Sequence, residues 1–133
     1  MISSYVGGRT VPGTAGSLTS TNPARRDDVV AEVSLASAEQ VVEAFRVATE
    51  AQRAWADTPA PVRGRVIAQV GRLVEANKQA LAELVTREVG KPMAESLGEV
   101  QEIIDTCDFF LGEGRRMYGQ TVPSEMRDKQ LFT

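Results

Sequence analysis

The sequence predicts a mainly α-helical fold with short β-hairpin elements at its front. Three observations support this fold class. Residues 37–118 contain four successive blocks in which apolar residues recur at helical spacing, as in amphipathic helices. Residues 1–36 instead contain short extended runs separated by turn-forming residues, with polar and apolar positions that alternate over residues 29–35. Residues 119–133 return to apolar residues at the end of the chain and are expected to form an extended arm.

The composition is that of an ordinary globular protein. Of the 133 residues, 42% are hydrophobic and 25% are charged, and the net charge is −3. The interspersed charges argue against nucleic-acid or anionic-membrane partners, which favour a basic surface. No stretch approaches the roughly 18 apolar residues of a membrane span. The opening residues lack the pattern of a signal peptide, and one cysteine cannot form an internal disulfide, so we expect a cytoplasmic protein.

The first 36 residues read as strands and turns. Gly7-Gly8 separates two short extended runs and predicts a hairpin, because glycine adopts positive φ without strain. Asn22-Pro23 predicts a turn. Residues 29–35 alternate as a half-buried strand is expected to do, and one side would carry Val29, Ala31, Val33 and Leu35.

The first two helical blocks have recognisable boundaries. Ser37 and Gln40 have the spacing of a capping box at the start of the first helix. Its apolar stripe would consist of Val41, Phe45, Ala48 and Trp55. A second helix is expected to begin at Thr58-Pro59, and Asn77 can end it. The expected buried stripe of this second helix is Val62, Val66, Ile67, Val70, Leu73 and Val74.

The third and fourth helical blocks meet at Gly90-Lys91-Pro92. Gly90 suits the position after a helix end, and Pro92 opens a long fourth helix. The broad apolar face of this last helix would carry Leu97, Val100, Ile103, Ile104, Cys107, Phe110 and Leu111. A Gly-Lys pair can also belong to a phosphate-binding loop. Here it follows a helix rather than a strand, and proline removes an N–H donor, so a corner is the favoured interpretation.

The residues needed for several common chemistries are missing. The chain has no histidine and one cysteine, which excludes nearly every zinc site and the usual base of a nucleophilic triad. Catalysis by carboxylate, lysine or tyrosine side chains is still possible, but the sequence shows no recognisable catalytic pair of such residues. Cys107 lies on an apolar helix face without a nearby cation to lower its pKa, so we interpret it as a core residue.

The chain resembles the front of the aldehyde dehydrogenase superfamily over about residues 5–133. The likeness rests on several motifs in collinear order: "YVGG", "TNPA", "VVAEVSLAS", "AQRAWADTPAPVRGRV", "TREVGKPMAESLGEV" and "FFLGEGRRMYGQTVPSE". The bacterial NAD(P)-dependent members that act on semialdehydes look most similar. The resemblance implies the N-terminal helical part of an α/β coenzyme-binding domain, followed by the first arm of an oligomerisation sheet.

The resemblance also implies a function for the whole protein. Family members oxidise an aldehyde to a carboxylic acid with NAD or NADP, through a thiol nucleophile, a glutamate base and a cofactor core that all lie downstream of the matched region. We therefore expect no catalytic and no cofactor-binding residue here, no bound cofactor, and no activity of this chain alone. The expected partners are the remainder of such a chain and further copies in a homo-oligomer.

Two sites are implied by position in the family pattern. Glu88, with backbone oxygens near Ser20 and Thr21, would help to hold a monovalent cation; the alternative is a solvated carboxylate at a helix end. Glu99 would border the substrate entrance; the alternative is a solvated acidic helix face. Trp55 and Arg63 match a family W-x-x-x-P-x-x-x-R spacing and are interpreted as structural, with Arg63 bonding backbone carbonyls at a helix junction.

A second hypothesis belongs to a different class of function. The chain would then be a stand-alone, non-catalytic helical module for interaction or oligomerisation. Helices that normally cover a missing sheet should expose large apolar patches, whereas a stand-alone module should behave as a well-folded monomer. This contrast separates the two hypotheses.

Overall fold

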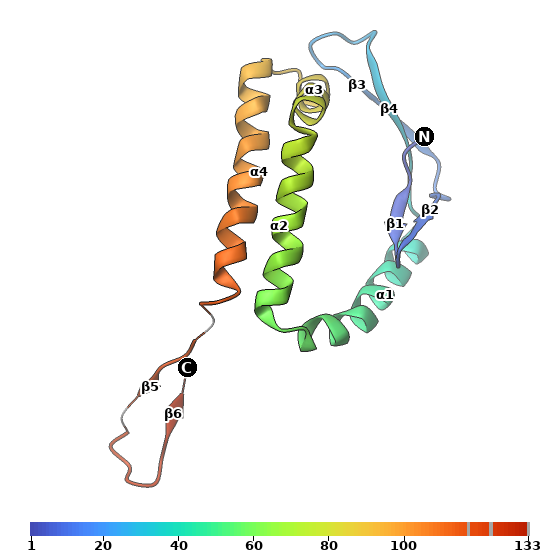
Figure 1. Ribbon diagram of the computed structural model, residues 1–133. Coiled ribbons are helices and arrows are strands. Elements are labelled where there is room, and N and C mark those ends of the chain that lie inside the picture. The colour runs from blue at the N-terminus through green and yellow to red at the C-terminus, as the bar shows by residue number, and fades with distance from the viewer. Residues whose placement is uncertain (117, 123, 133) are drawn as a thin grey trace.

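The computed structural model describes residues 1–116, 118–122 and 124–132. Its four helices are α1 (Ala38–Asp57), α2 (Ala60–Ala76), α3 (Lys78–Val89) and α4 (Met93–Glu113). The six strands are β1 (Ser4–Val6), β2 (Arg9–Val11), β3 (Ser17–Thr21), β4 (Val29–Ser34), β5 (Thr121–Val122) and β6 (Leu131–Phe132). Figure 1 shows α2 and α4 side by side, α3 at one end of the pair, and the β5–β6 hairpin projecting from the other end.

The strands form three separate antiparallel pairs, β1–β2, β3–β4 and β5–β6. The predicted Gly7-Gly8 hairpin is confirmed, and both glycines have positive φ (58° and 79°). The burial predicted for β4 is only partly right. Ser34 lies on the side opposite to the predicted apolar positions, yet it is the buried residue of β4, and its hydroxyl accepts the Gly13 amide and donates to the Ile2 carbonyl.

The helix boundaries follow the predicted signals. Ser37 and Gln40 form the capping box of α1. Asn77 ends α2, and Gly90 ends α3 in the left-handed region with φ 73°. Pro92 is the N-cap of α4, so Gly90-Lys91-Pro92 is a corner between two helices, as predicted. Among the described residues, no helix has both the length and the apolar character needed to cross a membrane.

The core of the protein lies between α2 and α4 and differs from the predicted stripe. On α2 the buried residues are Gly64, Ala68 and Gly71. Val66, Val70 and Leu73 were expected to be buried, and they are roughly half exposed. The prediction was wrong for these three residues, because small residues let the two backbones approach and the larger side chains point outward, whereas Val62, Ile67 and Val74 are half-buried.

The facing residues of α4 were predicted more accurately. Val100, Ile104 and Cys107 are buried, as expected, although Ile103 and Phe110 are about half exposed. Cys107 lies directly against α2: a Cβ built on Gly71 would be 2.8 Å from the Cys107 Cβ. At the end of the pair, a Cβ on Gly114 would be 2.6 Å from the Ala60 carbonyl oxygen. Glycine is therefore required where the two helices touch.

The first helix is the least covered element. α1 has the predicted capping box, but none of its residues is buried, and Phe45 is 72% exposed. Trp55 does not enter a core either and is 40% exposed. In Figure 1, α1 runs from the N-terminal strands towards α2 along its own course, outside the α2–α4 pair. The sequence of α1 has an apolar stripe, but no other described element covers it, and its side chains are largely exposed to solvent.

We expect Gly71→Val to destabilise the fold by about 1–3 kcal/mol, because the added side chain overpacks the contact with Cys107. Gly98→Val is the matched control: Gly98 also lies within a helix, but a Cβ there meets nothing within 4 Å. The control should change stability by no more than about 0.5 kcal/mol. Urea unfolding of both variants checks this. Equal effects at the two glycines would contradict the close-packing account.

Candidate functional site

A bidentate ion pair joins the β3–β4 hairpin to the C-terminal half of α3. Arg87 donates from Nη2 to Asp28 Oδ1 (2.7 Å) and from Nε to Asp28 Oδ2 (3.2 Å). The same Nη2 donates to the Val29 carbonyl (3.0 Å). Bidentate arginine–carboxylate pairs fix geometry as well as charge. The pair therefore sets the position of the hairpin on α3.

Asp28 is held in its ionised form by three donors. Hydrogen bonding from Arg87 is the largest cause, followed by the Asn22 amide and Arg25, and together they hold the pKa of Asp28 well below its usual value. Its side chain is only 12% exposed to solvent. A carboxylate that accepts several hydrogen bonds is strongly favoured over its protonated form.

The predicted Asn22-Pro23 turn is confirmed and packs against the end of α3. Asn22 is buried; its Oδ1 accepts the Ala24 amide (2.9 Å) and its Nδ2 donates to Asp28 (3.2 Å). Gly90 lies directly beneath this turn. A Cβ on Gly90 would be 2.8 Å from Pro23 Cγ, and its φ of 73° already disfavours any other residue.

The structure brings two of the three predicted cation-site residues together. The Ser20 hydroxyl donates to Glu88 Oε1 (3.0 Å), which joins β3 to α3. Thr21 follows Ser20 at the point where the β3–β4 register shifts. No group of three or more His, Cys, Asp or Glu side chains suited to a metal ion occurs among the described residues. The monovalent-cation site stays a prediction.

Glu99 is engaged by a neighbour within the chain. Lys91, from the corner before α4, forms an ion pair with the Glu99 carboxylate. Lys91 is thus turned towards α4, and the following Pro92 lacks the N–H that a phosphate-binding loop would use. The role of Glu99 at a substrate entrance stays a prediction.

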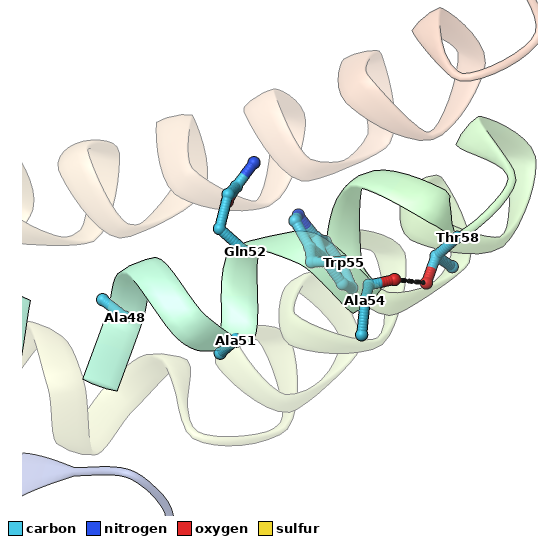
Figure 2. A pocket seen from close by; sticks show the side chains of 6 residues that line it. All are labelled: Ala48, Ala51, Gln52, Ala54, Trp55 and Thr58. Carbon is cyan, nitrogen blue, oxygen red and sulfur yellow. Dashed lines mark hydrogen bonds between the residues drawn. The ribbon is translucent and has the colours of Figure 1, made fainter. Parts of the chain in front are cut away.

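The remaining candidate residues have structural surroundings. Cys107 is a buried free cysteine between α2 and α4, as predicted. Trp55 lines a shallow groove of about 540 Å³ together with Gln52, three alanines of α1 and Thr58. Figure 2 shows this groove and the hydrogen bond from the Thr58 hydroxyl to the Ala54 carbonyl (2.9 Å). None of the residues that line it is a titratable acid or base, so the groove offers no group for proton transfer.

The hydrogen bonding of Arg63 differs from what the sequence predicted. We expected its guanidinium to bond backbone carbonyls at the helix junction. Instead, its Nε is buried and has no hydrogen-bond partner among the described residues.

Sequence reasoning missed the interactions that hold the site together. Arg87 and Asp28 are 59 positions apart, and no local pattern connects them. Ser96, fully buried on α4, places its hydroxyl 2.8 Å from that of Thr86 on α3. A serine within an apolar helix face was the available signal for this second contact, because buried hydroxyls require partners.

A comparison with models of protein families identifies the family of this chain. The model of the aldehyde dehydrogenase family matches residues 11–133. The chain belongs to this family. The earlier resemblance, drawn from motifs in collinear order, is confirmed over nearly the whole chain.

Curated aldehyde dehydrogenases are similar to the chain over part of their length. Aldehyde dehydrogenase family 7 member A1 of Pisum sativum is 40% identical over 113 residues, which cover 85% of this chain and 22% of the plant protein. Alpha-aminoadipic semialdehyde dehydrogenase of Bos taurus is 42% identical over 105 residues, which cover 77% of this chain and 19% of the bovine protein. The chain thus spans about a fifth of these two relatives.

Solved structures agree with the fold. An NADP-dependent enzyme of E. coli matches 98% of this chain and 27% of its own, with a TM-score of 0.91 and 30% sequence identity. The NAD-dependent benzaldehyde dehydrogenase of Corynebacterium glutamicum matches with a TM-score of 0.87 and 27% identity, over 97% of this chain and 28% of its own. The four helices and two-stranded sheets correspond to the N-terminal part of aldehyde dehydrogenase structures.

We predict that Asp28→Asn lowers the urea midpoint at pH 7, because it removes the ion pairs with Arg87 and Arg25. The folded-state pKa of Asp28 is depressed, so the stabilisation is complete above its ordinary value of 3.8 and is lost as the pH falls below it. The difference between wild type and variant should therefore shrink below about pH 4. Measurement at several pH values checks this.

Asp27→Asn is the matched control, since Asp27 is an exposed neighbour that forms no ion pair within the described part of the chain. It should leave the midpoint nearly unchanged at every pH. A difference for Asp28→Asn that stays constant from pH 7 to pH 3 would argue against the electrostatic account of this junction.

Proposed function

We propose that this chain is the N-terminal part of an NAD(P)-dependent aldehyde dehydrogenase that oxidises an aldehyde to a carboxylic acid. The observation that carries the proposal is the family match over residues 11–133, combined with coverage of only 19–22% of the two curated relatives. A segment that matches so small a share of a family's enzymes is expected to contribute scaffold to chemistry performed by the rest of the protein.

The role of the chain in such an enzyme follows from its own residues. The α2–α4 pair supplies a rigid wall, because glycines bring the two helix backbones into contact. The Arg87–Asp28 pair and Gly90 hold the β3–β4 hairpin on the end of α3. The open apolar side chains of α1 provide a surface for the portion of the enzyme that follows.

The reaction class comes from the relatives and not from a site in this chain. When bound in the intact enzyme, NAD or NADP supplies the hydride acceptor. In the family pattern that the chain resembles, the nucleophile and the cofactor core lie downstream of the matched region, so we propose that both lie outside residues 1–133. This chain would neither bind the cofactor nor turn over an aldehyde alone.

The name of the bovine relative supports a semialdehyde as substrate class. A semialdehyde carries a carboxylate at the end opposite to the reacting aldehyde, so the intact enzyme would need a cationic group to receive it. We further propose that the protein acts in the cytoplasm as a homo-oligomer, with the β5–β6 hairpin as part of the contact between copies. The β5–β6 hairpin projects from the helices, and its strand β6 carries the exposed Phe132.

The test is an assay of the purified 133-residue chain and of the intact protein that contains it. Each is incubated with α-aminoadipic semialdehyde and NAD⁺, then with NADP⁺ in place of NAD⁺, and absorbance at the reduced-cofactor band is followed. We expect reduced cofactor only from the intact protein. Sustained turnover by the 133-residue chain would refute the scaffold role.

Two further outcomes bear on the proposal. An intact protein that oxidises no aldehyde with either cofactor would refute the proposed activity. A native protein that ends at Thr133, and that is a monomer with a sharp melting transition, would favour the alternative of a stand-alone helical module.

A further inference from the structure

The side-chain amide of Gln40 links two parts of the chain that are distant in sequence. Its Oε1 accepts the backbone amides of Ser37 (3.0 Å) and Thr14 (3.0 Å). Its Nε2 donates to the Pro12 carbonyl (2.9 Å). The bond from Ser37 belongs to the capping box of α1, whereas the other two bonds reach the loop between β2 and β3. Gln40 therefore does more than cap a helix.

The neighbours of Gln40 determine which end of its amide faces which group. The two backbone N–H groups and the Thr14 hydroxyl (3.1 Å) donate, so they face the oxygen. The Pro12 carbonyl can only accept, so it faces the nitrogen. A carboxylate would place an oxygen against this carbonyl, and alanine would form none of these bonds. The position therefore requires an amide.

The loop that Gln40 reaches is also bound to the end of β4. The Gly13 amide donates to the Ser34 hydroxyl (2.9 Å), and the Ala15 amide donates to the Leu35 carbonyl (2.9 Å). A side chain would not fit at Gly13, because a Cβ there would be 2.2 Å from the Leu35 carbonyl oxygen. The loop thus has hydrogen bonds to the end of β4 and to the start of α1.

Apolar packing contributes little to the position of α1. None of its residues is buried. The β1–β2 hairpin approaches α1 at Gly7, where a Cβ would be 3.1 Å from Val47 Cγ1. Val42 and Phe45 are nevertheless 70% and 72% exposed. Figure 1 shows α1 beginning beside the β1–β2 hairpin and running from there towards α2. Directional hydrogen bonds at its start therefore have a large share in setting its direction.

We propose that Gln40 braces the corner between β4 and α1, so that residues 12–16 and the start of α1 open and close as one unit. Loss of the amide would then free loop hydrogen bonds that Gln40 does not itself make. The α2–α4 pair would stay folded, because its own close packing holds it. Gln40 is thus a positioning residue for α1. The inference goes beyond the proposed function and involves neither a cofactor nor an aldehyde.

Hydrogen–deuterium exchange of the native protein that contains this chain tests the brace. In Gln40→Ala, the amides of Gly13 and Ala15 should exchange about five- to tenfold faster, although neither of them bonds to Gln40. Ser37→Ala is the matched control, because it removes the hydroxyl cap of the same helix and leaves the bonds between Gln40 and the loop in place. It should speed exchange in the first turn of α1 and leave Gly13 and Ala15 within about twofold of wild type.

Gln40→Glu reverses this control. A glutamate keeps the acceptor oxygen of the capping box but lacks the N–H that reaches the Pro12 carbonyl. It should leave the first turn of α1 protected and still speed exchange at Gly13 and Ala15. If Gln40→Ala does not fold, Gln40→Glu takes its place in the comparison with Ser37→Ala.

Two outcomes would overturn the inference. Equal exchange at Gly13 and Ala15 in the Gln40 and Ser37 variants would show that Gln40 is a helix cap only. Exchange that rises to the same extent in the buried core of α4 would show that the whole protein opens, and not this corner. Faster exchange confined to residues 12–16 and the start of α1 supports the brace, whether or not the protein oxidises aldehydes.

Discussion

The close approach of α2 and α4 is the constraint on which the rest of the structure depends. Gly71 and Gly114 face Cβ or backbone atoms of the other helix at distances that leave no room for a side chain, and Gly64 is also closely packed. This contact buries Ala68, Val100, Ile104 and Cys107, the main apolar core of the described chain. Because glycines line the contact, bulkier residues of α2 such as Val66 and Leu73 turn outward.

The N-terminal hairpin is joined to this core by polar interactions rather than by apolar burial. The Arg87–Asp28 pair, the Ser20–Glu88 hydrogen bond and the fit of Gly90 under Pro23 all meet at the end of α3. Such contacts are short-ranged and directional, so they fix where the hairpin lies. Ser20 and Glu88 also belong to the predicted monovalent-cation site, which stays a prediction.

Two features of the described residues agree with the proposal that the chain is part of a larger protein. α1 carries an amphipathic pattern yet buries none of its residues, and Phe45 is largely exposed. Arg63 has a buried donor without an acceptor. A folded protein normally covers its largest apolar patches and pairs its buried donors. In the proposed larger protein, the remainder of the aldehyde dehydrogenase would cover the apolar side chains of α1.

The sequence by itself determined the local structure and the family. The capping box at Ser37, the helix end at Gly90 and the hairpin at Gly7-Gly8 depend on residues adjacent in the chain, so a reading of neighbours was sufficient. Tertiary structure alone decided which side of α2 is buried and which partner Asp28 has. Periodicity favours large apolar residues for a core, whereas the distance between two helices is set by the smallest residues at their contact. Arg87 and Asp28 are brought together by the fold across 59 positions, and no pattern in the chain encodes that distance.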